Sequence, residues 1–271
     1  MLLLMLLVTA GCTTKIAYNY AHWWANWAVD DYIDLDREQK AFFKSEFRQL
    51  HQWHRETQLP LYVEFLEQLR TTLSEQQLTA DSIHKQALAT QQLMEHSKKK
   101  VTPALAQLLS SLSAKQADKL LKTLARETEK YLEENTYKTE EKRHKARRKA
   151  MTRFIKKWIG PLSREQKQLI EEWAQAMHPM AQLDADQQML WQQKFADALA
   201  GAQQADIQIF LDRYLLDDES LWQAEYREQT EKNRRATRQL LANLLNSRSD
   251  KQRRKLDKKL NNLIEDFTQL Q

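Results

Sequence analysis

Apolar residues recur along most of this chain at intervals of three and four positions, which is the period of an α-helix. No stretch alternates apolar and polar residues with the period of a strand. The clearest stripes are Ile16, Tyr20, Trp23 and Trp27; Phe43, Phe47, Leu50 and His54; Leu169, Ile170, Trp173 and Met177; Trp191, Phe195, Ala198 and Leu199; and Leu256, Leu260, Leu263, Phe267 and Leu270. The pattern predicts an all-α fold, an elongated body of several helices.

The expected helix starts share one phrase, in which Leu precedes Ser or Asp and Gln follows three positions later. Such a pair forms a capping box, because each side chain bonds the backbone N–H group of the other residue. The phrase occurs at 35–39, 73–77, 112–116, 162–166 and 183–187. We therefore expect helices to begin after Asp36, Ser74, Ser113, Ser163 and Asp184.

Residues 133–149 contain no helix breaker and almost no residue that could be buried. A helix that is polar all round bridges packed regions through solvent. We therefore predict one long central helix over about 113–159, which joins sub-regions 15–132 and 150–271. Helix hairpins would pack at both of its ends.

Composition supports the helical class. The chain has 3 Gly and 4 Pro among 271 residues, whereas the turns of β-sheets draw heavily on both. Leu, Ala, Gln, Glu, Lys and Arg, which favour helices, supply most of the sequence.

An apolar run at the N-terminus ends in Ala10-Gly11-Cys12, the pattern of a bacterial lipoprotein signal. We expect residues 1–11 to be the signal peptide and residues 12–271 to be a periplasmic body. Cys12 would carry a diacylglycerol thioether and an N-acyl chain, with no other cofactor. No basic residue precedes the run, which suggests that the true start lies upstream of Met1. Thr13, where Asp would retain the protein in the inner membrane, predicts the periplasmic face of the outer membrane.

The basic residues gather in two runs, although the formal net charge is only +5. One run lies between 138 and 157, and the other between 248 and 259. A periplasmic protein meets no nucleic acid, so the expected partner is a protein or an anionic envelope component. The predicted partner-binding residues are Lys142, Arg143, Lys145, Arg147, Arg148 and Lys149.

The aromatic residues behind Cys12 allow two interpretations. Trp is enriched at membrane interfaces, but its helical spacing here suggests packing against a core. We expect Trp23 and Trp27 to be core residues and leave Trp24 open.

Trp53, His54 and Arg55 form the predicted structural cluster. Arg55 would pair with Asp30, Asp31 or Asp34, while Trp53 fills the core beneath it. The alternative is an acid–base pair of Asp34 and His54, but the sequence offers no nucleophile or Gly-rich turn to complete a site. His51 and His54 lack the further ligands of a metal site. We expect no enzyme activity and no metal.

The order of residues in the front block is specific. It reads Lys15-Ile16-Ala17-Tyr18-Asn19-Tyr20, Trp27, Asp30-Asp31-Tyr32, Leu35, Gln39, Trp53-His54-Arg55 and Leu59-Pro60. This order resembles a family of proteobacterial envelope lipoproteins of unknown function, which implies a helical, outer-membrane lipoprotein. The capping phrase has a more limited similarity to the Leu-Thr-x-x-Gln signature of Spy-type periplasmic chaperones, although Ser or Asp replaces Thr here.

These observations predict a lipid-anchored periplasmic interaction or scaffold protein without catalytic activity, and a chaperone-like role is one form that this function could take. One alternative is a protein that binds anionic lipid or lipopolysaccharide through its basic helices. The other is a hydrolase centred on His54.

Overall fold

Every regular element of the chain is a helix in the computed structural model, which describes residues 12–74, 77–215 and 219–271. The predicted all-α class is confirmed. The α-helices are α2 (Cys12–Asn19), α3 (Ala21–Tyr32), α4 (Arg37–Trp53), α5 (Leu59–Ser74), α6 (Ala80–Ser110), α7 (Ala114–Asn135), α8 (Glu140–Ile159), α9 (Arg164–Ala176), α10 (Ala181–Ala200), α11 (Gln204–Tyr214), α12 (Ala224–Asn246) and α13 (Asp250–Leu270). A π-helix, η1 (His54–Gln58), and a 3-10 helix, η2 (Glu219–Leu221), complete the set. The predicted signal peptide, residues 1–11, lies outside the described residues.

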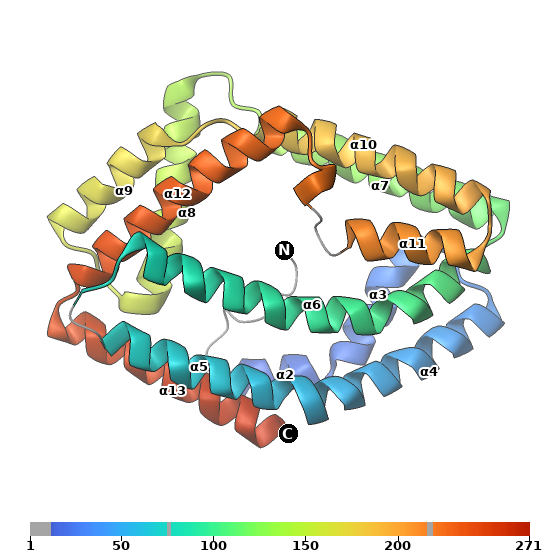
Figure 1. Cartoon of the computed structure of the whole chain (residues 1–271), viewed down its shortest axis with the longest axis horizontal. Coiled ribbons are helices and arrows are strands. Elements are labelled where there is room, and N and C mark those ends of the chain that lie inside the picture. The colour runs from blue at the N-terminus through green and yellow to red at the C-terminus, as the bar shows by residue number, and fades with distance from the viewer. Residues whose placement is uncertain (1–11, 75–76, 216–218) are drawn as a thin grey trace.

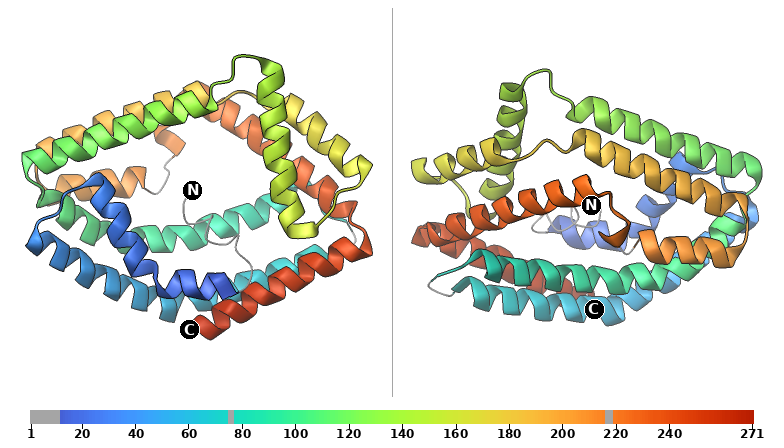
Figure 2. Two further views of the ribbon diagram at one scale, coloured as in Figure 1. Left: turned by 180° about the vertical axis from the view of Figure 1, so that it is seen from behind. Right: turned by 45° about the horizontal axis from the view of Figure 1, so that its top comes forward.

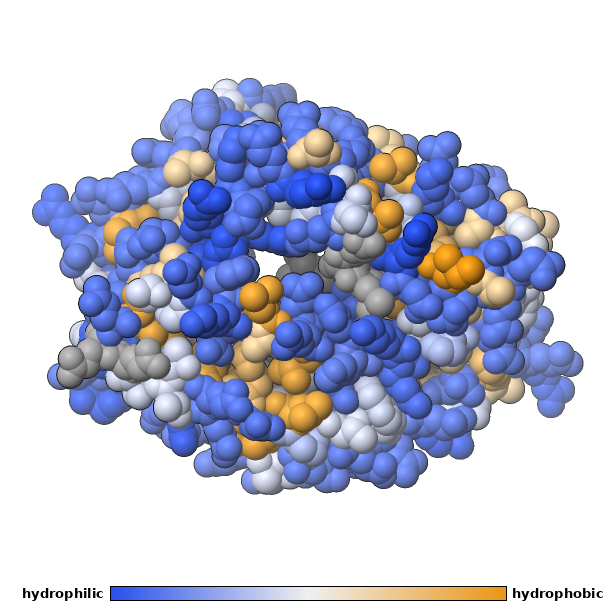
Figure 3. Space-filling view, in the orientation of Figure 1, coloured by the Kyte–Doolittle hydropathy of each residue, from blue (hydrophilic) through white to orange (hydrophobic). Residues whose placement is uncertain are grey.

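The helices close into a ring around a central opening (Figure 1). The lower edge of the ring consists of α4 and α5, with α13 along α5, and α7 packs on α10 at the upper right. Seen from behind, α2, α3 and α8 lie on the near face of the ring (Figure 2). The opening persists when all atoms are drawn (Figure 3).

The longest unbroken helical stretch is α4, η1 and α5 together, 38 residues from Arg37 to Ser74. The predicted continuous helix over 113–159 is wrong, because α7 ends at Asn135 and α8 begins at Glu140. Thr136 is extended, and the Thr139 side chain accepts a hydrogen bond from the backbone N–H of Lys142 at 3.3 Å. A threonine that caps a new helix thus interrupts a stretch without Gly or Pro. A turn, and not a bare rod, joins residues 15–132 to 150–271.

Three of the five predicted capping boxes are present, with Asp36, Ser113 and Ser163 as N-caps. The predictions at Ser74 and Asp184 are wrong. Ser74 ends α5 and donates to the carbonyl oxygen of Thr71 at 2.6 Å. Asp184 lies within α10.

Two capping boxes were not predicted. Thr79 and Ser82 begin α6, and Ser249 and Gln252 begin α13. Arg248 stands where the sequence phrase requires Leu. The capping phrase, which includes Leu, therefore did not predict the start of α13.

The glutamines of the capping boxes also join distant loops. Gln39 and Gln116 donate to each other's side-chain oxygens at 3.3 and 2.6 Å. Gln39 also donates to the carbonyl oxygen of Ser111 at 2.8 Å, and Gln116 to that of Asp34 at 2.7 Å. These bonds connect the start of α4 to the start of α7.

The opposite end of the ring repeats this arrangement. Gln166 and Gln252 donate to each other at 3.0 and 2.9 Å. Gln166 donates to the carbonyl oxygen of Ser247 at 3.2 Å, and Gln252 to that of Pro161 at 2.7 Å. Gln166 is completely buried, so these bonds replace water entirely.

The two ends are similar because the chain contains two copies of one helical unit. Residues 105–124 and 241–260 are identical at 12 of 20 positions, and residues 35–40 and 162–167 at 5 of 6. The contacts between helices follow the same correspondence, in which α3, α4, α5, α6 and α7 match α8, α9, α10, α12 and α13. The last helix of each unit packs on the other unit, α7 on α10 and α13 on α5.

Two hydrophobic cores fill the two ends of the ring. One core contains Leu59, Ile155, Ile170, Leu244 and Leu260, from α5, α8, α9, α12 and α13. The other draws mainly on α6, α7, α10 and α11. The prediction of packed clusters at both ends is therefore confirmed, although a ring and not a rod separates them.

We expect Gln166→Ala to destabilise the fold by about 2–4 kcal/mol, because it removes a cap and takes away one hydrogen-bond partner each from the buried Gln252 amide and the Ser247 carbonyl. Gln168→Ala, on the exposed face of the same helix, should change stability by less than about 0.5 kcal/mol. Urea titration followed by circular dichroism measures both. Equal losses of stability in the two variants would show that the hydrogen bonds between Gln166 and Gln252 do not stabilise the fold.

Candidate functional site: a basic groove between α8 and α9

A groove with a volume of about 620 Å³ lies between α8 and α9. Its walls are Lys145, Arg148, Lys149, Thr152, Arg153 and Lys156 of α8 and Lys167 and Glu171 of α9. The α8 residues follow the spacing i, i+3, i+4, i+7, i+8 and i+11, which places them on one helix face. The volume is in the range of sites that bind small ligands or lipid headgroups.

Positive charge dominates the groove. Glu171 is its only carboxylate, and Arg148 forms an ion pair with it. The hydrogen bond from Arg148 lowers the pKa of Glu171 below its usual value. Within the described part of the chain, no ion pair is found for the other five cations of the groove, Lys145, Lys149, Arg153, Lys156 and Lys167. The groove therefore has an excess of charge that an anion would balance.

The predicted partner-binding residues divide between this groove and the packed side of α8. Lys145, Arg148 and Lys149 line the groove. Lys142 lies one turn before Lys145 and is exposed, while its backbone N–H is capped by Thr139. Arg143 and Arg147 point elsewhere and serve the fold.

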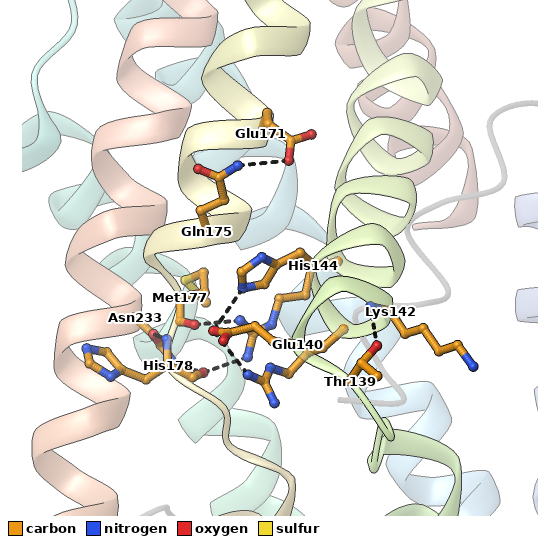
Figure 4. A network of polar contacts seen from close by, with 11 residues as sticks. Thr139, Glu140, Lys142, His144, Glu171, Gln175, Met177, His178 and Asn233 are labelled. Atoms are coloured by element: carbon orange, nitrogen blue, oxygen red, sulfur yellow. Dashed lines mark hydrogen bonds and ion pairs between the residues drawn. The ribbon is translucent and has the colours of Figure 1, made fainter.

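Arg143 and Arg147 belong to a polar network at the start of α8, of which Figure 4 labels Glu140, His144, Met177 and His178. Glu140 pairs with Arg143 at 3.3 Å and with His144 at 3.4 Å. Arg147 donates to the carbonyl oxygens of Met177 and His178, the latter at 2.8 Å. Because Met177 is the C-cap of α9, Arg147 satisfies the carbonyl groups at the end of that helix.

Three cations of the groove were absent from the predicted set: Arg153, Lys156 and Lys167. The helical spacing of the α8 residues could have identified Arg153 and Lys156. No signal in the sequence pointed to Lys167, since its place depends on how α9 packs against α8.

The second basic run meets the end of α8. Lys259 is partly buried, and its ammonium lies 5.8 Å from the ring centre of Trp158. Burial lowers the pKa of Lys259, and Lys255 and Lys157 lower it further. Arg248 is buried and donates to carbonyl oxygens of Leu245 and Leu73, so it contributes to the fold and not to an exposed surface.

Comparison with known families places these features in a larger group. A family of unknown function (DUF6279) matches residues 31–227, most of the chain. The chain belongs to the DUF6279 family. The matched span contains α8, α9 and the whole basic groove. No curated protein and no solved structure matches the chain.

The predicted cluster around His54 joins α2 to the ring in this DUF6279 protein. His54 Nδ1 lies 3.0 Å from the Tyr18 hydroxyl, and Nε2 lies 3.3 Å from the Tyr62 hydroxyl. Tyr62 in turn lies 3.4 Å from the Ser97 hydroxyl. Burial lowers the pKa of His54 to about 4 and raises that of Tyr18 to about 12. The His54 and Tyr18 side chains are therefore both uncharged at pH 7.

Two details of the predicted cluster are wrong. Arg55 donates to Asn19 at 3.0 Å and lies over the Tyr18 ring, and does not pair with an aspartate. Asp34 pairs instead with Lys119 at 2.6 Å, so the alternative acid–base pair with His54 is not formed. Trp53 is only partly buried and lies beneath Lys100.

The tryptophan side chains that follow Cys12 in the sequence are exposed. Trp23 and Trp27 are 56% and 58% exposed, and Trp24 is 53% exposed. The prediction that Trp23 and Trp27 are core residues is therefore wrong. Their helical spacing does place them on one face, but nothing among the described residues covers that face.

Among the described residues, no three His, Cys, Asp or Glu side chains are grouped to hold a metal ion. No described helix is both long and apolar enough to span a bilayer.

We expect acid to destabilise the fold through His54. Because its pKa is about 4 in the folded chain and about 6.5 when unfolded, protonation favours the unfolded chain as the pH falls from 6.5 to 4. This effect should cost about 1–3 kcal/mol after allowance for partial exposure and level off below pH 4. Chemical unfolding at pH 7 and pH 4.5 measures it. His54→Gln, which does not titrate, should lose less stability over this interval, and an equal loss in both proteins would exclude His54 as the cause.

Proposed function

We propose that this protein is a lipid-anchored, non-catalytic binding protein of the bacterial envelope, which holds a phosphate-bearing envelope component in the α8–α9 groove. The observation that supports this proposal is the set of five cations that line the groove and have no carboxylate partner among the described residues. The family match assigns no activity, so the proposal rests on the groove and on the sequence around Cys12.

The chemistry of the groove suits phosphate. Lys presents a compact charge and Arg a planar fork, and both bind phosphate oxygens strongly. Because these Lys and Arg side chains are exposed, they remain in contact with water, where salt limits electrostatic attraction to about 8–10 Å. Binding should therefore weaken as salt concentration rises, and several phosphate groups along one ligand would bind better than a single one.

The anchor is the second part of the proposal. Cys12 follows Ala10-Gly11 in the sequence and is the first residue of α2, although its side chain lies outside the described part of the structure. Thioether and amide acylation there would attach three chains, more than the two signals that stable anchoring requires. Thr13 supports the periplasmic face of the outer membrane.

Binding without catalysis is supported by the partners of the buried titratable groups. His54 lies between two tyrosine hydroxyls, and Asp184 accepts a hydrogen bond from Tyr131 at 2.6 Å. Glu171, the carboxylate of the groove lining, is held in an ion pair with Arg148. We therefore do not favour a hydrolase centred on His54.

Charge reversal tests the groove. We expect the triple variant Lys145→Glu, Lys149→Glu and Arg153→Glu to lose lipopolysaccharide binding by at least tenfold, because it inverts three unpaired charges. The matched control is Lys251→Glu, Arg254→Glu and Lys258→Glu on α13, which changes the net charge equally at exposed positions. Isothermal calorimetry at two salt concentrations measures both variants, and circular dichroism checks that both fold.

Equal losses in the two triple variants would show attraction by net charge alone and would reject the groove as the site. An acidic protein client is the other partner for such a groove. If the unchanged protein ignored lipopolysaccharide but prevented aggregation of an acidic client, and the groove variant did not, the phosphate ligand would be wrong and a chaperone-like role correct.

Acylation of Cys12 predicts a specific mass for the mature protein. The mature protein should begin at Cys12 and carry diacylglycerol and one further acyl chain, as measured by intact-mass spectrometry of the membrane fraction. Cys12→Ser should abolish the added mass and release the protein from membranes. A mature protein with an unmodified Cys12 would contradict the anchor, whatever the groove binds.

A further inference from the structure

Five large apolar side chains on α2, on α3 and at the residue between these helices are exposed to solvent. Ile16, Tyr20, Trp23, Trp24 and Trp27 are between 53% and 58% exposed. Trp23 and Trp27, four positions apart in α3, share a helix face; Ile16 of α2 and Tyr20, which separates the two helices, precede them in the sequence. Among the other large apolar residues of the described chain, Ile209 is 57% exposed, whereas Leu88, Phe154 and Met189 are 45–50% exposed. We call the five residues the aromatic stripe.

The helices that carry the stripe are fixed to the ring by their opposite side. Tyr18 packs against one core, and Val29 and Tyr32 pack against the other. Lys15 pairs with Asp266 of α13 at 3.4 Å. The stripe is therefore the outer side of a docked segment, and it faces away from both cores.

Charge along this segment is scarce. Between positions 12 and 29 the sequence contains one Lys, one His and no Asp or Glu. The first carboxylates, Asp30 and Asp31, follow at the end of α3. A surface of Trp and Tyr without carboxylates suits the interface of a lipid bilayer, where these rings place an apolar body beside the acyl chains and a polar edge among the headgroups.

A further helix, α8, also supports a lipid bilayer as the binding partner of the aromatic stripe. Figure 2 shows α2, α3 and α8 on one face of the molecule. Of these, α8 carries the basic groove and also exposes Phe154. Anionic headgroups attract such basic helices. The protein therefore offers basic groups on α8 as well as the aromatic stripe, and a surface that lies on a membrane uses both kinds of group.

We propose that the aromatic stripe inserts into the interfacial region of the bilayer and sets the orientation of the ring on the membrane. The proposal deepens the proposed function, because an acylated Cys12 at the start of α2 would hold Tyr20 within about 12 Å of the attachment point at 1.5 Å per residue. The anchor supplies attachment, and the stripe determines which face of the ring meets the lipid.

The test uses the processed chain, residues 12–271, with Cys12→Ser, so that no lipid contributes. Both cores are built from residues 18–270, so this chain retains them. Because Cys12 is the only cysteine, Ala28→Cys introduces a unique site for an environment-sensitive dye on α3, and Gln193→Cys on α10 is the control position. The probe is a vesicle of pure phosphatidylcholine, which carries no net charge.

We expect the dye at position 28 to shift to the blue and brighten when vesicles are added, and the dye at position 193 to remain unchanged. Trp23→Ser, Trp24→Ser and Trp27→Ser together should weaken partitioning at least tenfold. The matched control, Leu88→Ser, Met189→Ser and Ile209→Ser, also removes three exposed apolar side chains and should leave partitioning within twofold. Circular dichroism checks the fold of both.

Three results would overturn the proposal. The first is no dye response of the unchanged stripe to vesicles, and the second is an equal loss in both triple variants. The third is a concentration-dependent dimer, seen in sedimentation velocity, that the Trp variant abolishes, since the stripe would then bind a second copy. The groove variant should still partition into neutral vesicles, so the stripe and the groove can fail separately.

Discussion

The reciprocal amide pairs are the contacts on which the ends of the ring depend. A carboxamide both donates and accepts, so two glutamines can satisfy each other, cap their own helices and still reach a carbonyl of the facing loop. Gln39–Gln116 and Gln166–Gln252 each do this where four helices converge. A glutamate could not donate, and an apolar residue would leave the loop carbonyls buried without partners. The same solution at both ends follows from the duplicated unit.

This framework separates the cations of the chain by role. Arg147 and Arg248 point inward and donate to carbonyl oxygens at helix ends. The cations on the open face of α8 have no such partners, because the packed side of that helix is already filled by Ile155, Trp158 and Ile159. Charge remains unbalanced there, while the exposed aromatic side chains lie elsewhere in the fold, on and next to α3.

The sequence predicted the helices well, because periodicity and capping residues are local properties. The sequence did not predict those features that depend on tertiary packing. The absence of Gly and Pro over 133–149 did not reveal that Thr139 would start a new helix. The spacing of Trp23 and Trp27 identified a common face but could not tell whether another helix covers it. In the groove, Arg153 and Lys156 could have been found from helical spacing, whereas Lys167 requires knowledge of how α9 lies against α8.

The exchange of the last helices between the two units has a kinetic consequence. The apolar face of α5, with Leu59 and Leu66, packs against Leu260, Leu263 and Phe267 of α13, nearly at the other end of the chain. Contacts of such long sequence separation form slowly. During synthesis from the N-terminus, α5 would be complete long before α13. Completion of this core would then wait for the whole chain, and the exposed intermediate would depend on chaperones to avoid aggregation.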